Sequence, residues 1–200
     1  ILLTNIKGLA SLGYFNFGSG FVNLLRQVSD AVRKSWNPFY YNKVNENTAN
    51  VKKIVVNRFE QLFFLLSIPG TIIILFSEEI ILLFGSEKFY LSMFIIPIYA
   101  FTYFIHLTDF LSSNQITSSE KLMYQMPSAV AGGIASIVLN IIFIQKFGAI
   151  GVAIAASLTF LISHIINMYF GNKLFPLPIN IKKLLLLFSV LIIISSFSYI

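Results

Sequence analysis

Long apolar runs, separated by short polar connections, constrain this chain more than any other feature of its sequence. Near-uniform apolar runs occupy residues 62–76, 126–144, 149–170 and 184–194. Several of them approach the roughly 20 residues that a helix needs to cross the hydrocarbon core of a membrane. Only 11% of the residues are charged and 56% are hydrophobic, which leaves too little charge to cover the surface of a soluble domain.

Backbone hydrogen bonding decides which structure these runs adopt. Because no water satisfies backbone N–H and C=O groups in the hydrocarbon core, only helices and closed barrels cross membranes. The alternation of apolar and polar residues that is typical of barrel strands is absent from these runs. We therefore predict an all-α, polytopic helical membrane protein with about six transmembrane helices. The predicted helices span residues 9–34, 54–76, 91–113, 126–144, 149–170 and 181–200.

The ends of the chain and its composition add further expectations. The chain starts at Ile1 and stops inside an apolar run at Ile200, so we expect a segment of a longer protein. No basic stretch followed by a small-residue cleavage site is visible at the start, so no signal peptide is predicted. The absence of cysteine excludes disulfides, thiolate metal ligands and cysteine nucleophiles.

Two connections have a clear local signal. Pro38 is expected to lie beyond the end of the first helix, because proline cannot continue a helix interior and pushes Asn37 out of the helical region. The aromatic residues Trp36, Tyr40 and Tyr41 beside it suit an anchor at the lipid headgroups. The connection at residues 145–148 is so short that the two helices flanking it must form a tight antiparallel hairpin.

Basic residues are distributed unevenly between the two sides of the predicted bundle. Eleven of the 14 Lys and Arg residues lie around the first, third and fifth connections. Lys7, Lys88 and Lys146 lie on the opposite side. The positive-inside rule then places the first, third and fifth connections in the cytoplasm. The net charge of +6 is explained in this way, and we expect no nucleic-acid partner.

Small residues mark two predicted packing faces. Gly132, Ser136 and Asn140 are spaced by four residues in one helix, as are Gly151 and Ala155 in the next. Apolar burial gains little inside lipid, so close backbone approach and interhelical hydrogen bonds drive helix association. We interpret these residues as packing contacts rather than as substrate contacts.

Polar residues inside membrane spans require an explanation, and residues 9–34 hold the densest set. Asn23, Arg26 and Asp30 recur at intervals of three and four and so share one helical face. This face predicts a hydrated, cationic wall for a phosphate-bearing substrate, with Asp30 positioning the cations. The alternative is that Arg26 snorkels to the interface while Asp30 pairs with Lys34. We interpret Arg33 and Lys34 as interface anchors.

His106 and Asp109, three residues apart in the third predicted helix, form a second candidate site. Such a pair can relay a proton or couple a cation gradient, or it can be a hydrogen-bonded structural pair. His164 and Asn167 have the same spacing and are interpreted as structural. Two isolated histidines without a carboxylate cluster predict no metal site. No catalytic or cofactor-binding motif occurs, so we expect neither an enzyme nor a cofactor.

An ordered set of motifs then points to a family. These motifs are residues 12–14 (LGY), 36–41 (WNPFYY), 82–89 (LLFGSEKF), and Asn140 followed by residues 146–155 (KFGAIGVAIA). In order and spacing, over about residues 9–170, they resemble the second half of polysaccharide repeat-unit flippases. These flippases belong to the multidrug/oligosaccharidyl-lipid/polysaccharide exporter superfamily. Val152 departs from the pattern, since the family usually has a small residue there.

The resemblance implies a transporter of about twelve to fourteen helices, with two lobes around a central cavity, of which this chain is most of the second half. Its substrate would be an undecaprenyl-pyrophosphate-linked oligosaccharide, moved across the bacterial cytoplasmic (inner) membrane for O-antigen, capsule or exopolysaccharide synthesis. Polysaccharide polymerase and chain-length components would be its protein partners. Arg26, with Asn23 and Asp30, would bind the pyrophosphate through charge-assisted hydrogen bonds.

Two other functions remain open from the sequence. A cation-coupled drug exporter of the same superfamily would need deep acidic residues, and Asp109 is the plausible one, which favours the flippase. A non-transporting membrane scaffold of a glycan assembly complex is the second alternative, because six helices alone cannot form a two-lobed cavity.

Overall fold

The computed structural model describes residues 2–46 and 50–179, and these residues are almost entirely helical. The helices are α1 (Leu2–Asn45), α2 (Val51–Leu75), α3 (Ser77–Phe84), α4 (Ser92–Ser118) and α5 (Met126–Leu174), with short 3₁₀ helices η1 (Glu87–Phe89) and η2 (Leu122–Gln125). The all-α prediction is confirmed for this part of the chain. The last predicted helix, residues 181–200, lies outside the described residues.

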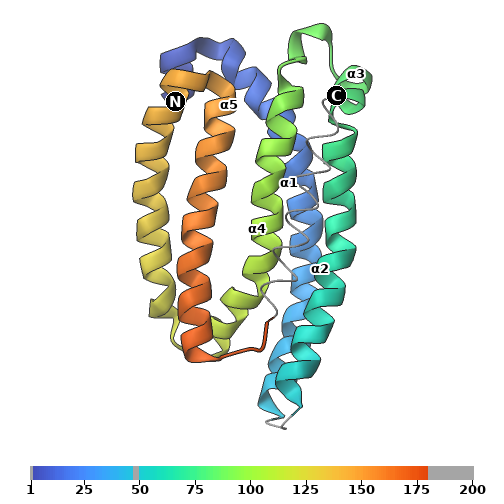
Figure 1. Cartoon of the computed structure of the whole chain (residues 1–200), viewed down its shortest axis with the longest axis vertical. Helices are drawn as coiled ribbons and strands as arrows, with labels where there is room; N and C mark the ends of the chain where they lie inside the picture. Colours follow the sequence, from blue (N-terminus) through green and yellow to red (C-terminus); the bar gives the residue numbers. More distant parts are fainter. Residues whose placement is uncertain (1, 47–49, 180–200) are drawn as a thin grey trace.

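The long element α5 is a hairpin of two antiparallel helices, which lie side by side in Figure 1 in yellow and orange. Gly148 reverses the chain, with φ 58° and ψ −126°, a conformation that residues with a Cβ rarely adopt. Behind the turn, a Cβ at Gly151 would collide with the backbone of Phe143. The two predicted helices and their tight connection are therefore confirmed, and Gly151 serves the close packing predicted for it.

The prediction that the first helix ends before Pro38 is wrong. After a kink at Gly8, α1 continues through Pro38 to Asn45. A proline in a helix loses one backbone hydrogen bond, and the packing of the surrounding turns compensates for that loss here. Trp36 and Tyr40 are buried, at 5% and 0% exposure, and Trp36 lies against Phe59 of α2 at 6.3 Å between ring centroids. They are core residues rather than exposed interface anchors.

Helix α4 is the centre of the bundle. In the most apolar stretch of α4, 67% of the residues are buried, compared with 33% in the corresponding stretch of α2. Hydrogen bonds connect it to each long neighbour: Ser92 Oγ donates to the Tyr14 carbonyl at 2.8 Å, Tyr103 Oη to the Leu66 carbonyl at 2.6 Å, and Ser157 Oγ to the Ile98 carbonyl at 2.8 Å. Side-chain hydroxyls and backbone carbonyls therefore connect α4 to α1, α2 and α5 in the interior.

Three helical stretches among the described residues are long and apolar enough to cross a membrane: α2, α4 and Leu122–Leu174. The membrane class is thus supported, whereas six spans are not established. Helix α1 is not among the three. In Figure 1 the C-terminal end of α1, the N-terminal end of α2 and the C-terminal end of α5 lie at one end of the bundle. Helix α3 and the turn of α5 lie at the other end. This is the alternation that the distribution of basic residues requires.

Candidate functional site

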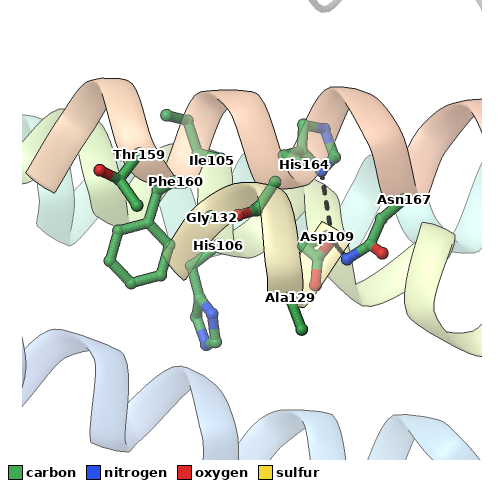
Figure 2. A pocket seen from close by; sticks show the side chains of 10 residues that line it. Ile105, His106, Asp109, Ala129, Gly132, Thr159, Phe160, His164 and Asn167 are labelled. Carbon is green, nitrogen blue, oxygen red and sulfur yellow. Dashed lines mark hydrogen bonds and ion pairs between the residues drawn. The ribbon is translucent and has the colours of Figure 1, made fainter. Parts of the chain in front are cut away.

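A cavity of about 300 Å³ lies between α4 and the two halves of α5 (Figure 2). Helix α4 contributes Ile105, His106 and Asp109, the first half of α5 contributes Ala129 and Gly132, and the second half contributes Thr159, Phe160, Ser163, His164 and Asn167. Six of these ten residues are polar or ionisable, in a bundle whose outer surface is largely apolar. This contrast marks the cavity as the candidate site, because polar groups inside a membrane protein usually serve function.

One wall of the cavity is formed by a close contact within the α5 hairpin. Gly132 is buried, and a Cβ there would collide with Ser163 Oγ. Ser163 in turn donates a hydrogen bond to the Ser128 carbonyl at 3.2 Å. The predicted packing role of Gly132 is confirmed. Asn140, in contrast, donates to the Ser136 carbonyl of its own helix at 2.7 Å and not to a neighbouring helix.

Asp109 of α4 accepts two hydrogen bonds from α5. Its Oδ1 atom lies 3.3 Å from His164 Nδ1 and 3.2 Å from Asn167 Nδ2, and Figure 2 shows both side chains turned toward it. The other ring nitrogen of the histidine, Nε2, lies 3.0 Å from Thr108 Oγ1. His164 is therefore held at both ring nitrogens by consecutive residues of α4.

A second histidine–carboxylate pair connects α4 to α1. His106 Nε2 lies 2.9 Å from Asp30 Oδ1, and the ring packs edge-on against Phe110. The Asp30 side chain is half exposed, while that of His106 is mostly buried. Asp30 thus pairs with a histidine on another helix and not with Lys34 of its own.

His106 and Asp109 both lie at the site, but their hydrogen bonds go to other helices. Residues three apart share a helix face, but the side chains diverge toward different neighbours. Here His106 turns to α1 and Asp109 turns to α5. Each histidine has a carboxylate partner on another helix, Asp30 for His106 and Asp109 for His164. Spacing along one helix carried no signal for these pairs, because each pair joins two helices.

The arginines of α1 lie against aromatic rings of the other two helices. The Arg26 guanidinium lies 4.7 Å from the ring centroid of Phe160, a residue of the cavity wall. The Arg33 guanidinium lies 5.0 Å from the ring of Phe110 on α4. Arg33 was expected to be an interface anchor, but this contact draws it toward the bundle. Asn23, predicted to bind substrate with Arg26, is half-buried and does not line the cavity.

Two buried polar atoms of the cavity wall, Thr159 Oγ1 and Asn167 Oδ1, have no hydrogen-bond partner within the described residues. A buried polar atom without a partner costs free energy, so both favour a polar occupant of the cavity. Within the same residues no three His, Asp or Glu side chains come together as metal ligands would. These groups can bind an anion through Arg26 and a proton through the histidine–carboxylate pairs.

Comparison with protein-family models, curated proteins and solved structures finds no match to this chain.

Proposed function

We propose that this chain is half of a membrane transporter of the polysaccharide repeat-unit flippase type, which moves a pyrophosphate-linked oligosaccharide lipid across the membrane. The observation that carries the proposal is the contact of Arg26 with Phe160, which holds a permanent cation beside a polar cavity inside an apolar bundle. The ordered sequence motifs at residues 12–14, 36–41, 82–89 and 146–155 provide the family-level support.

The chemistry of Arg26 suits a phosphate-bearing substrate. The contact with Phe160 is a cation–π contact, which needs no hydrogen-bond acceptor and so leaves the guanidinium N–H groups available to other partners. A phosphate accepts hydrogen bonds from these N–H groups in a two-point arrangement that a lysine cannot reproduce. Phe160 therefore orients the guanidinium without competing with a phosphate for its donors.

The size of the cavity limits what it can hold. At about 300 Å³ it lies at the lower end of the range for ligand pockets. It accommodates a small polar group such as a phosphate, but not several sugar rings. In the proposed transporter, the sugars would lie between this half and the other half, and the charged headgroup would lie near Arg26.

A cation-coupled exporter of the same superfamily is the second candidate. The sequence favoured it less, because Asp109 was the one deep acidic residue expected. The interhelical pairs Asp30–His106 and Asp109–His164 strengthen this candidate, since both involve ionisable groups that can exchange a proton. Coupling to a cation is compatible with either substrate.

The test is transport by the full-length protein in proteoliposomes, with a pyrophosphate-linked oligosaccharide lipid on one leaflet. Arg26→Ala should lower transport about tenfold to a hundredfold, which corresponds to one lost charge-assisted hydrogen bond. Arg26→Lys should restore only part of the activity, because it keeps the charge but loses the fork.

Arg58→Ala is the matched control, because Arg58 is an exposed arginine of α2 that bonds to Gln61 of its own helix. It should transport like the unmodified protein. Normal transport by a well-folded Arg26→Ala protein would contradict the substrate role of Arg26. Transport of a cationic drug, with no transport of the glycolipid, would favour the exporter.

A further inference from the structure

We propose that Asp109 and His164 form a proton-binding site, in which the Thr108 hydroxyl turns from a backbone carbonyl to His164 when the proton leaves. The site connects α4 to the second half of α5 at the cavity wall. The ligand of the site is a proton. Asp109, His164 and Thr108 satisfy one another's hydrogen bonds both when the proton is bound and when it has left.

Hydrogen-bond counting at Thr108 carries the proposal. Its Oγ1 atom lies 2.8 Å from the Ile105 carbonyl and 3.0 Å from His164 Nε2. A hydroxyl has one hydrogen to donate, so it can serve only one of these two atoms at a time. When that hydrogen points to Ile105, the contact with His164 requires a proton on Nε2.

The same reasoning applies to the opposite ring nitrogen. His164 Nδ1 lies 3.3 Å from Asp109 Oδ1, so a proton must lie between this nitrogen and the carboxylate. With Nε2 also protonated, the pair is either an imidazolium facing a carboxylate or a neutral histidine facing a carboxylic acid. Both descriptions contain the same number of protons and the same net charge of zero. The pair as a whole holds the proton.

Release of the proton leaves a second satisfied arrangement. The Nε2 proton passes to water in the cavity, and the Thr108 hydroxyl turns to donate to the vacated nitrogen. Nδ1 keeps its proton and its bond to Asp109. The Ile105 carbonyl keeps the backbone hydrogen bond of the helix, so it is not left without a partner. The net charge of the site changes from zero to minus one.

The charged and titratable groups nearest to this pair of residues lie on α1 and α4. Arg33 of α1 lies close enough to Asp109 for their charges to attract, and Arg26, Asp30 and Arg33 lie around His106. Helix α4 adds His106, which pairs with Asp30. The first half of α5 contributes only Ala129 and Gly132 to the cavity wall and no titratable side chain. Loss of the proton therefore leaves a negative charge that attracts Arg33 and strengthens the contact of α1 with α4.

The importance of this proton for transport rests on the proposed function, whereas proton binding itself does not. The test is ¹⁵N NMR of the full-length protein in lipid nanodiscs with ¹⁵N-labelled histidine, and the His164→Gln variant assigns the signals. Below the pH at which the pair releases its proton, both ring nitrogens of His164 should carry protons. As the pH rises, His164 should become neutral with its proton on Nδ1. A neutral form protonated on Nε2 would overturn the proposal.

Two variants sharpen the experiment. Asp109→Asn keeps the shape but removes the carboxylate, so His164 should become neutral at a lower pH than in the unmodified protein. Asp30→Asn makes the same change in the other pair and should leave the titration of His164 unchanged. If Asp109→Asn fails to fold, the titration of the unmodified protein still decides the matter.

A transport measurement separates the site from the function. Transport by the unmodified protein should change with pH in step with the titration of His164, and Asp109→Asn should lose that dependence. If transport by Asp109→Asn still depends on pH, the site has no role in transport. A titration as expected, in a protein that moves no glycolipid, would leave the proton site intact and reject the flippase.

Discussion

The two histidine–carboxylate pairs of this bundle share their chemistry but differ in their surroundings. His106 and Asp30 lie 2.9 Å apart, with the carboxylate 50% exposed, while His164 and Asp109 lie 3.3 Å apart, with the carboxylate 25% exposed. In the first pair only Nε2 of the histidine takes part in a hydrogen bond within the described residues. In the second, both ring nitrogens do so.

The difference shows that a second hydrogen-bond partner on the histidine ring decides whether the hydrogen bonds of the pair depend on its proton count. His106 can be neutral and still donate to Asp30, so its pair can act as an interhelical contact without an added proton. His164, held between Asp109 and Thr108, changes its hydrogen-bond pattern whenever its proton count changes. The same two residue types thus form a link between helices at one place and a proton site one helical turn away.

The largest expected effect comes from removing the enclosed carboxylate. Asp109→Ala leaves His164 and Asn167 without their acceptor inside the bundle. We expect a loss of stability of about 3 kcal/mol, because two mostly buried donors lose their hydrogen-bond acceptor. Asp30→Ala, at the more exposed pair, should cost less than about 1 kcal/mol. Thermal unfolding of the purified full-length variants measures both. Equal losses would remove the distinction between the pairs.

A substitution in the cavity wall tests whether the enclosure of the second pair depends on helix packing. Gly132→Leu must displace Ser163, so it should destabilise the protein by about 1–3 kcal/mol, as overpacked cores do. The neighbouring Gly133 has nothing within 4 Å of an added Cβ and is the matched control. Gly133→Leu should fold normally. Similar yields of folded protein from the two variants would contradict the close contact of the two halves of α5.

The smallest effect is expected at the histidine of the exposed pair. In His106→Gln the amide can still donate to Asp30, so stability should change by less than about 1 kcal/mol. His164→Gln can replace only one of two contacts and should be the more destabilising of the two substitutions. Thermal unfolding in the same lipid environment makes the comparison. A larger loss for His106→Gln would reverse the assignment of the two pairs.

Local sequence signals predicted well those helices whose bounds do not depend on packing against neighbouring elements. The apolar runs at residues 54–76 and 91–113 correspond closely to α2 and α4, and Gly148 makes the turn expected at residues 145–148. Pro38 misled the prediction, because the packing of Trp36 and Tyr40 against α2 outweighs the preference of a single proline. The short helix α3 was not anticipated, since eight residues carry too little periodicity to stand out.

The sequence by itself determined the membrane class and the list of polar residues that need an explanation, because both follow from composition and from helical spacing along one chain. Asp30, His106 and Asp109 were all identified in this way. The tertiary structure alone decided their partners, bringing His164 to Asp109 and His106 to Asp30. Spacing along a helix gives the face on which a side chain lies. Which neighbour covers that face depends on how α1, α4 and α5 pack, and that packing is set by contacts between residues far apart in the chain.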